Sequence, residues 1–308
     1  MTTRPRSVTR ARAVAAGGLT ATLLLLLTAC GAGGGNDRTE GDGPQTAFKI
    51  GYTAGSILDE KLAKEVAKLA PDHGITVEPV QIEDSKLKNL AVSQGDIDAN
   101  HSQHQEWMRV QNEDGNLGLY AAGDWYVLKF SGYSEKFDKL EDLPKGAKVA
   151  IPDDPSNQAQ ALQTLQDLGQ LTLKDGVDPS RVTIRDVKDN PKSFEFTEAA
   201  LAQLPRTLPD VDLALGWRSN FDLADVSDDK IVFNAPAYEL YWIEVVINEK
   251  NKDNPDFAPL LDTYHDPRIG QLIDSDPFFS RVAQSIESAR ATDRSQTNVD
   301  GAAAKPAG

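Results

Sequence analysis

The stretch VAIPDDPSN, residues 149–157, joins a short apolar run to a polar turn and the start of a helix. Its first four residues predict a buried strand, and residues 156–168 carry apolar side chains at helical spacing. Gly169 follows, and glycine often ends a helix because it accepts the left-handed backbone conformation found there. The stretch therefore predicts one strand–helix unit of an α/β sheet.

The same alternation of apolar runs and amphipathic segments continues on both sides of this unit. Leu58, Leu62, Val66 and Leu69 recur at helical spacing and predict another helix, which Pro71 ends. Strands are predicted at residues 48–52, 77–82, 97–100, 149–152, 182–187, 211–215, 231–233 and 242–248. This chain order predicts two α/β lobes joined by two crossovers, with a ligand between them at the carboxyl ends of the strands.

Composition and charge narrow the class of protein. The chain has 308 residues, of which 40% are hydrophobic and 26% charged, as in an ordinary globular protein. Lys and Arg total 32 against 47 Asp and Glu, and this deficit of cations argues against binding nucleic acid or an anionic lipid surface. A single cysteine excludes an intramolecular disulfide framework and a cysteine-rich zinc site.

The N-terminus has the layout of a secretory signal. Four arginines without an acidic residue precede an apolar stretch at residues 13–29, which is short for a membrane-spanning helix. The stretch runs into LTACG, residues 27–31, which resembles the lipobox of bacterial lipoproteins. This resemblance implies that Cys30 is lipidated and that the chain is cut before it. We therefore predict an exported protein, anchored to the cell membrane through Cys30 and facing the extracytoplasmic side.

Composition also divides the chain into segments. The residues after Cys30 are polar and glycine-rich, and the last residues of the chain are small and polar. The predicted segments are a signal peptide at 1–29, a flexible lipid-anchored tether at 30–46, lobe 1 at 47–130 with 236–291, lobe 2 at 131–235, and a disordered tail at 292–308.

Three groups of motifs lie in the predicted folded body. They are GDIDANHSQHQ at 95–105, VAIPDDPSN at 149–157 with LKDGV at 173–177, and NPK at 190–192 with AQLPR at 202–206 and DVD at 210–212. Their sequence and spacing resemble the NlpA/MetQ family, the methionine-type substrate-binding lipoproteins of bacterial ABC importers. The QHQ and VAIPxDPxN pieces are specific, and weaker similarity extends over residues 48–273.

The resemblance implies a type II periplasmic-binding-protein fold, in which two α/β lobes close on one small ligand. It also implies that an amino acid or a derivative is delivered to an ABC permease in the membrane without covalent chemistry. Closure is a hinge transition that the ligand drives by contacting both lobes. We accordingly expect a monomer that is not an enzyme and needs no cofactor.

The resemblance also assigns ligand-binding positions, several of them altered in this chain. His104 keeps a pocket histidine of the family, and Trp107 stands where another aromatic residue lines the pocket. Two further pocket aromatics fall on Ser85 and Ser102. The arginine that pairs with the ligand carboxylate falls on Gln160, whose neutral amide cannot replace a bidentate guanidinium.

The remaining assigned positions follow the second and third motifs. Asn157 closes the second motif, and Asn220 stands before an aromatic residue as in the family, although the segment before it is shifted by one residue. Arg218 could restore the lost carboxylate contact from the opposite lobe. These departures predict a ligand that is more polar or bulkier than methionine.

A turn after the first predicted strand supplies two weaker candidates, Thr53 and Ser56. The turn, residues 51–56, opens onto a helix N-terminus, whose backbone N–H groups suit an anionic ligand group. A plain tight turn between a strand and a helix explains the same residues equally well.

Some residues of the sequence also fit functions other than binding a small ligand. Trp125, Tyr126 and the aromatic residues of 238–242 could form an interface for a partner protein on a surface lipoprotein, or they could line the hinge and cleft. His101 and His104, near Asp98 and Glu106, could hold a metal in a metal-binding importer component, yet no metal site is predicted because the other two histidines lie in unrelated segments. No hydrolase or nucleotide-binding motif is present, which argues against an enzyme.

Overall fold

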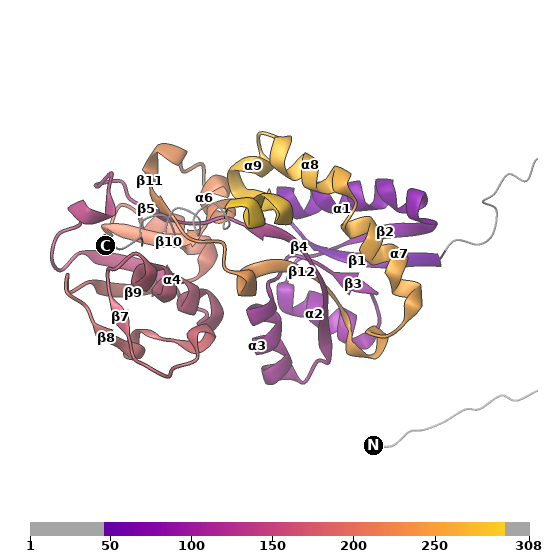
Figure 1. Cartoon of the computed structure of the whole chain (residues 1–308), viewed down its shortest axis with the longest axis horizontal. Coiled ribbons are helices and arrows are strands. Elements are labelled where there is room, and N and C mark those ends of the chain that lie inside the picture. Colours follow the sequence, from indigo (N-terminus) through magenta and orange to yellow (C-terminus); the bar gives the residue numbers. More distant parts are fainter. Residues whose placement is uncertain (1–45, 293–308) are drawn as a thin grey trace, which may run out of the picture. The chain divides into compact units, whose positions relative to one another are not determined.

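The computed structural model describes residues 46–292, which fold around two β-sheets (Figure 1). The first sheet has the strand order β13-β4-β12-β3-β1-β2, and the second has the order β11-β5-β10-β6-β9. The predicted signal peptide, Cys30 and nearly all of the predicted tether and tail lie outside the described residues.

Lobe 1 denotes the first sheet and the helices packed on it. Its strands are β1 (Thr46–Thr53), β2 (Ile75–Ile82), β3 (Ala99–Asn100), β4 (Leu119–Leu128), β12 (Trp242–Asn248) and β13 (Ala283–Ser285). Its helices are α1 (Ile57–Leu69), α2 (Ser85–Gln94), α3 (Gln105–Gly115), α7 (Ala258–Tyr264), α8 (Pro267–Ser275) and α9 (Phe279–Val282). Strands β1, β2 and β3 are parallel, whereas β12 pairs antiparallel with both β3 and β4.

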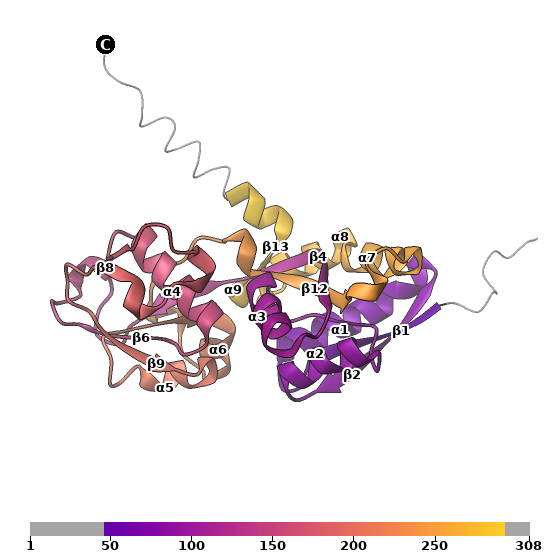
Figure 2. The same cartoon turned by 90° about the horizontal axis from the view of Figure 1, so that it is seen from below.

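Lobe 2 denotes the second sheet and its helices. Its strands are β5 (Phe130–Tyr133), β6 (Lys148–Pro152), β9 (Glu195–Ala199), β10 (Leu213–Trp217) and β11 (Ile231–Asn234), and its helices are α4 (Pro155–Asp167), α5 (Leu204–Thr207) and α6 (Arg218–Leu223). A short pair, β7 (Thr172–Leu173) and β8 (Val187–Asp189), lies apart from this sheet. The strands of the two sheets form separate groups in both views (Figures 1 and 2).

The chain passes between the sheets twice. It leaves the first sheet after β4 and enters β5 across Lys129, and it returns from β11 to β12 through residues 235–241. Each sheet has its own apolar core, so the two sheets are packed as two bodies. The predicted α/β class and two-lobe fold are confirmed.

The helices form where the sequence provides caps and an apolar face. Asp154 caps α4 by accepting a hydrogen bond from the Asn157 N–H at 3.0 Å, and Pro155 occupies the first turn, where it needs no donor. Leu162 and Leu165 then lie fully buried against the second sheet. The strand–helix unit predicted from residues 149–168 is therefore confirmed.

One predicted strand is wrong. Residues 182–187 form a 3₁₀ turn at Ile184–Asp186, and β8 begins only at Val187. The Asp186 carboxylate accepts hydrogen bonds from the Thr183 N–H at 3.0 Å and from its hydroxyl at 2.8 Å. These local bonds offset the preference of the β-branched residues for a strand.

A buried amide cluster fixes the chain just before α3. The Gln103 side-chain amide donates to Asn89 Oδ1 at 2.6 Å and to Asn100 Oδ1 at 2.7 Å, and Asn89 Nδ2 donates back to Gln103 Oε1 at 2.9 Å. All three side chains are at most 4% exposed. Because buried amides that pair with one another hold a single geometry, this cluster determines where the next residue, His104, is placed.

Candidate ligand-binding site

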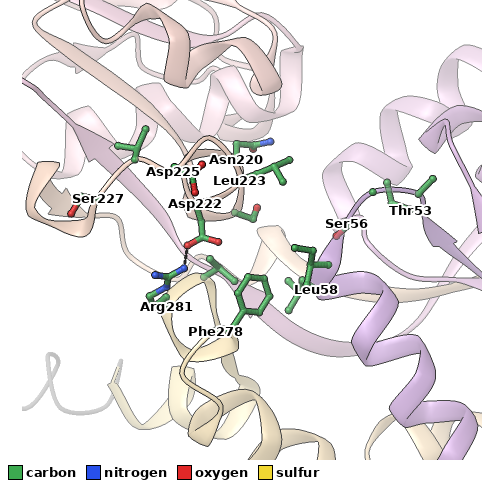
Figure 3. Close-up of a pocket in the computed structure, with 16 residues that line it drawn as sticks. Thr53, Ser56, Leu58, Asn220, Asp222, Leu223, Asp225, Ser227, Phe278 and Arg281 are labelled. Atoms are coloured by element: carbon green, nitrogen blue, oxygen red, sulfur yellow. Dashed lines mark hydrogen bonds and ion pairs between the residues drawn. The ribbon is translucent and has the colours of Figure 1, made fainter.

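A cavity of about 730 Å³ lies between the two lobes (Figure 3). One wall is the end of β1 and the first turn of α1, and the other is α6 and the residues after it. Strand β1 ends at Thr53, which lines this cavity, and α6 follows directly on the carboxyl end of β10. This is the location where α/β sheets bind small ligands. We call it the interlobe cavity.

The lobe 1 wall contains two of the predicted residues, Thr53 and Ser56. Ser56 caps α1 by accepting a hydrogen bond from the Asp59 N–H at 3.2 Å. Gly55, at φ = 77°, makes the tight turn between them in a conformation that other residues rarely adopt. Figure 3 shows Ser56 across from Asn220 and Leu223, with Thr53 farther back on the same wall.

The lobe 2 wall contains Asn220 together with acidic residues. Asp222 forms an ion pair with Arg281, which comes from α9 of lobe 1 and also lines the cavity. Asp225 makes no ion pair within residues 46–292. Two exposed apolar residues, Ile57 at 49% and Leu223 at 66%, line opposite walls.

Arg218 does not line the interlobe cavity. Its Nη1 donates to the Arg281 carbonyl oxygen at 2.8 Å, and its Nη2 lies 3.7 Å from Asp228 Oδ1. The guanidinium therefore ties α6 to α9 across the two lobes. In this arrangement it is engaged by protein groups rather than presented to the cavity.

His104 and Asn157 meet directly in a second contact between the lobes. His104 Nε2 lies 3.2 Å from Asn157 Oδ1, and the Trp217 indole N–H donates to the same oxygen at 2.9 Å. The Tyr241 ring lies edge-on to His104, with ring centroids 5.0 Å apart. These four side chains, all at most 5% exposed, constitute the interlobe contact.

The hydrogen bonds of His104 determine its protonation state. Its Nδ1 accepts from the Trp107 N–H at 3.2 Å as the N-cap of α3, so the ring proton is on Nε2 and points to Asn157. Burial lowers the pKa of His104 to about 4, so the ring is neutral at pH 7. Both ring nitrogens therefore bond to protein groups.

The other predicted residues are dispersed. Gln160 is buried in the middle of α4, and its Oε1 has no hydrogen-bond partner among residues 46–292. Ser102, at φ = 87°, likewise has a buried hydroxyl without a partner in the described part of the chain. Ser85 begins α2 and is half-buried, as is the Trp107 side chain on α3.

The aromatic residues considered as a partner interface are mostly interior. Trp125 and Tyr126 are 4% and 0% exposed, and Tyr241 and Trp242 are 1% and 3% exposed. Among residues 238–242, Leu240 is the one large apolar residue that is exposed, with 40% of its surface accessible. These rings pack in the cores and in the second crossover, so they do not form a surface patch.

The residues considered for a metal have separate partners. His101 Nδ1 lies 2.9 Å from the Tyr264 hydroxyl, whereas His104 faces Asn157. Over residues 46–292, no three His, Cys, Asp or Glu side chains are grouped so that they could hold a metal ion.

Within the same residues, every helix is too short or too polar to span a bilayer.

A buried lysine near the cavity was not among the sequence candidates. Lys88 on α2 is 1% exposed, and its Nζ donates to Thr53 Oγ1 at 2.6 Å and to the His101 carbonyl at 3.2 Å. Burial lowers its pKa to about 8, an effect partly opposed by Asp59. A lysine in a polar helix normally predicts a solvated face, so no sequence signal singled it out.

Two α/β lobes, two chain crossings and a cavity at the strand ends define the class of two-lobed substrate-binding proteins. The chain belongs to the NlpA lipoprotein family, whose model matches residues 48–284. The family and the substrate-binding class predicted from the sequence are thereby confirmed.

Individual relatives agree with this assignment. The chain is 34% identical over 228 residues to the D-methionine-binding lipoprotein MetQ of Escherichia coli K12. The aligned residues cover 72% of this chain and 82% of that protein. A nutrient-binding protein from Burkholderia cenocepacia, solved bound to methionine, matches 78% of this chain and 99% of its own at 32% identity and a TM-score of 0.69. A periplasmic substrate-binding protein of an ABC transporter from Coxiella burnetii matches 77% of this chain and 100% of its own at 28% identity and a TM-score of 0.69.

Proposed function

We propose that this protein captures a small amino-acid-like ligand between its two lobes and delivers it to an ABC permease. The observation that carries the proposal is the interlobe cavity, which is lined by both lobes, at the end of β1 and along α6 after β10. The relatives named above are described as binding methionine or as serving an ABC transporter. Their similarity over most of the chain supports the same function for this protein.

The proposed ligand contacts fall into two sets. Thr53, Ser56 and Asn220 line the interlobe cavity, so we assign them to the ligand in the arrangement described. His104, Asn157, Gln160 and the neighbouring Trp107, Ser102, Ser85 and Arg218 stay assigned through the family resemblance. Because His104 and Asn157 bond to each other across the lobes, opening the lobes would free both side chains for a ligand.

We further propose that Cys30 carries the lipid and holds the protein at the extracytoplasmic face of the membrane. The apolar stretch before it and the lipoprotein names of its relatives support this. The lobes would then be residues 47–130 with 236–291 and residues 131–235. The protein would act as a monomer without cofactor or metal, and binding and release would involve no covalent step.

Isothermal titration of the full-length protein in detergent tests the proposal. The ligands are the 20 standard amino acids, the chiral ones as L-enantiomers, and D-methionine, each titrated separately. We expect saturable one-to-one binding of at least one of them, as well as a raised melting temperature, since about 2.7 kcal/mol of stability is gained at 100 times Kd. Absence of binding throughout the panel would contradict the proposal. Binding of methionine alone would contradict the expectation of a more polar or bulkier ligand.

A further inference from the structure

A buried ammonium group lies behind the lobe 1 wall of the interlobe cavity. The Lys88 stem runs across Gly51 in β1, where a Cβ would lie 3.0 Å from Lys88 Cγ and 2.6 Å from Ile97 Cδ1. The absence of a side chain at Gly51 therefore gives the lysine its path along the strand. This path ends at Thr53, the last residue of β1 and a lining residue of the cavity.

Lys88 has no acidic partner in the described part of the chain. Its two hydrogen-bond acceptors, Thr53 Oγ1 and the His101 carbonyl oxygen, are both neutral. No carboxylate among residues 46–292 lies within 4.0 Å of its Nζ, and Asp59 acts on it only at longer range. A charge in this position is costly unless an anion compensates it.

Thr53 connects this charge to the cavity. Because Lys88 donates to Thr53 Oγ1, the hydroxyl hydrogen of Thr53 is left for another acceptor. The adjoining first turn of α1 also lines the cavity and contributes N–H groups of the same polarity. The lobe 1 wall therefore offers donors backed by a positive charge.

The opposite wall has the reverse sign. Arg281 neutralises Asp222, and Asp225 adds a carboxylate without an ion-pair partner among the described residues. A ligand carboxylate is disfavoured beside Asp225 and favoured beside Thr53. Gln160, where the resemblance places an arginine, offers no charge to hold that carboxylate in lobe 2.

We propose that the carboxylate of the amino-acid ligand binds at Thr53 on the lobe 1 wall, with Lys88 as the buried counter-ion behind it. The inference rests on the proposed function and specifies how the ligand is oriented. Thr53 contacts the carboxylate directly, whereas Lys88 acts through the Thr53 hydroxyl. An amino acid whose carboxylate is blocked as an amide should gain nothing from Lys88.

The test compares an amino acid with its own C-terminal amide. The probe is the tightest-binding member of the panel of 20 standard amino acids and D-methionine, titrated into full-length parent protein, Lys88→Met and Lys86→Met. Lys86 is an exposed residue of the same helix and serves as the matched control. We expect Lys88→Met to raise Kd for the acid by about tenfold or more, since the Thr53 contact loses the positive charge behind it, while Kd for the amide changes less than about twofold. Lys86→Met should leave both values unchanged.

Thr53→Val keeps the lysine and tests the proposal in a second, independent way. It removes the hydroxyl that contacts the carboxylate, so it should weaken the acid more than the amide even if Lys88→Met does not fold by circular dichroism. Equal weakening of acid and amide, or weakening of neither, would overturn this inference while the parent's binding upholds the proposed function. A parent that binds no member of the panel would overturn both.

Discussion

The two lobes meet in two regions of opposite character. In the interlobe contact, His104, Asn157, Trp217 and Tyr241 are buried and neutral. His104 and Trp217 are hydrogen-bonded to Asn157, and the Tyr241 ring packs on His104. In the interlobe cavity, the walls carry two exposed apolar residues, Ile57 and Leu223, and the charged residues Asp222, Asp225 and Arg281. The first region holds the lobes together, and the second leaves room between them. The comparison shows that the interlobe contact and the lining of the interlobe cavity have no residue in common.

The interlobe contact can be broken most severely at Asn157. Asn157→Ala removes the oxygen that accepts from both His104 Nε2 and Trp217 Nε1, leaving two buried donors unpaired. Each unpaired group costs about 1–3 kcal/mol, so we expect a loss of roughly 3 kcal/mol in the free energy of unfolding, measured by urea denaturation. Asn220→Ala in the cavity wall is the control and should cost less than about 0.5 kcal/mol. Similar losses in the two variants would contradict the distinction between the regions.

Acid should weaken the interlobe contact next. The pKa of His104 is about 4 in the folded protein and about 6.5 when the chain is unfolded, so the unfolded state binds the extra proton first as pH falls. Stability supplied by the neutral ring is intact above pH 6.5 and is lost towards pH 4, by about 2 kcal/mol at pH 5.

His104→Asn isolates this contribution from other acid-sensitive groups, including the buried His101, whose pKa is also lowered to about 4. Asparagine can still cap α3 but cannot titrate. Between pH 7 and pH 5, the variant should lose about 2 kcal/mol less stability than the parent in urea denaturation. Parallel pH profiles would show that His104 does not titrate as its burial requires.

Lys88, behind the cavity wall, is expected to lower the stability of the protein, in contrast to the residues of the interlobe contact. Its pKa, about 8 in the folded protein, lies below the ordinary value of about 10.5, so burying the charged form costs stability below pH 8. This cost is relieved as pH rises from 8 towards 10.5. We expect Lys88→Met to be more stable than the parent by roughly 1 kcal/mol at pH 7 without ligand, because the two acceptors it leaves unpaired offset part of the gain.

The difference between Lys88→Met and the parent should shrink above pH 8. The groups around the ammonium are Asp59 from α1, Thr53 from β1 and the His101 carbonyl. Guanidinium denaturation at pH 7, 8 and 9 measures the trend. A constant difference would mean that Lys88 is not buried in its charged form.

The smallest effect on stability is expected at the cavity rim. Leu223 is 66% exposed, so Leu223→Ser should change the free energy of unfolding by less than about 0.5 kcal/mol. Ligand affinity should nevertheless fall severalfold, because the residue lines the cavity and we expect a bound ligand to cover it. Thermal unfolding with and without the bound amino acid measures both. A large loss of stability without ligand would place Leu223 in the core instead.

The elements predicted correctly have strong local signals. The α4 helix is marked by its cap, its proline and its apolar spacing, and the family motifs identify the fold because their spacing spans both lobes. Strand β4 gave no such signal, because Gly123 and Asp124 interrupt its apolar pattern. Three of the five residues of β9 are polar, and the strand is partly exposed at the edge of the second sheet, so its period-two pattern is weak.

The site was less predictable than the fold, for a physical reason. The bond between His104 and Asn157 joins residues 53 positions apart, and it exists only because two separate lobes meet there. Lys88 was missed because α2 buries Lys88 and Asn89 while it exposes Leu87 and Leu90, at 57% and 37%. Composition alone predicts that the helix buries the face with the leucines and exposes the face with the lysine.

The place of β12 in the first sheet has a consequence for how the chain acquires its structure. β12 lies between β3 and β4 and pairs with both, although it follows them by more than 100 residues in the sequence. A nascent chain that ends before Trp242 holds every strand of lobe 2, but in lobe 1 the facing edges of β3 and β4 are left without their partner. Lobe 2 can therefore mature first during synthesis, and lobe 1 must wait for the last quarter of the polypeptide, a non-local pairing that slows folding.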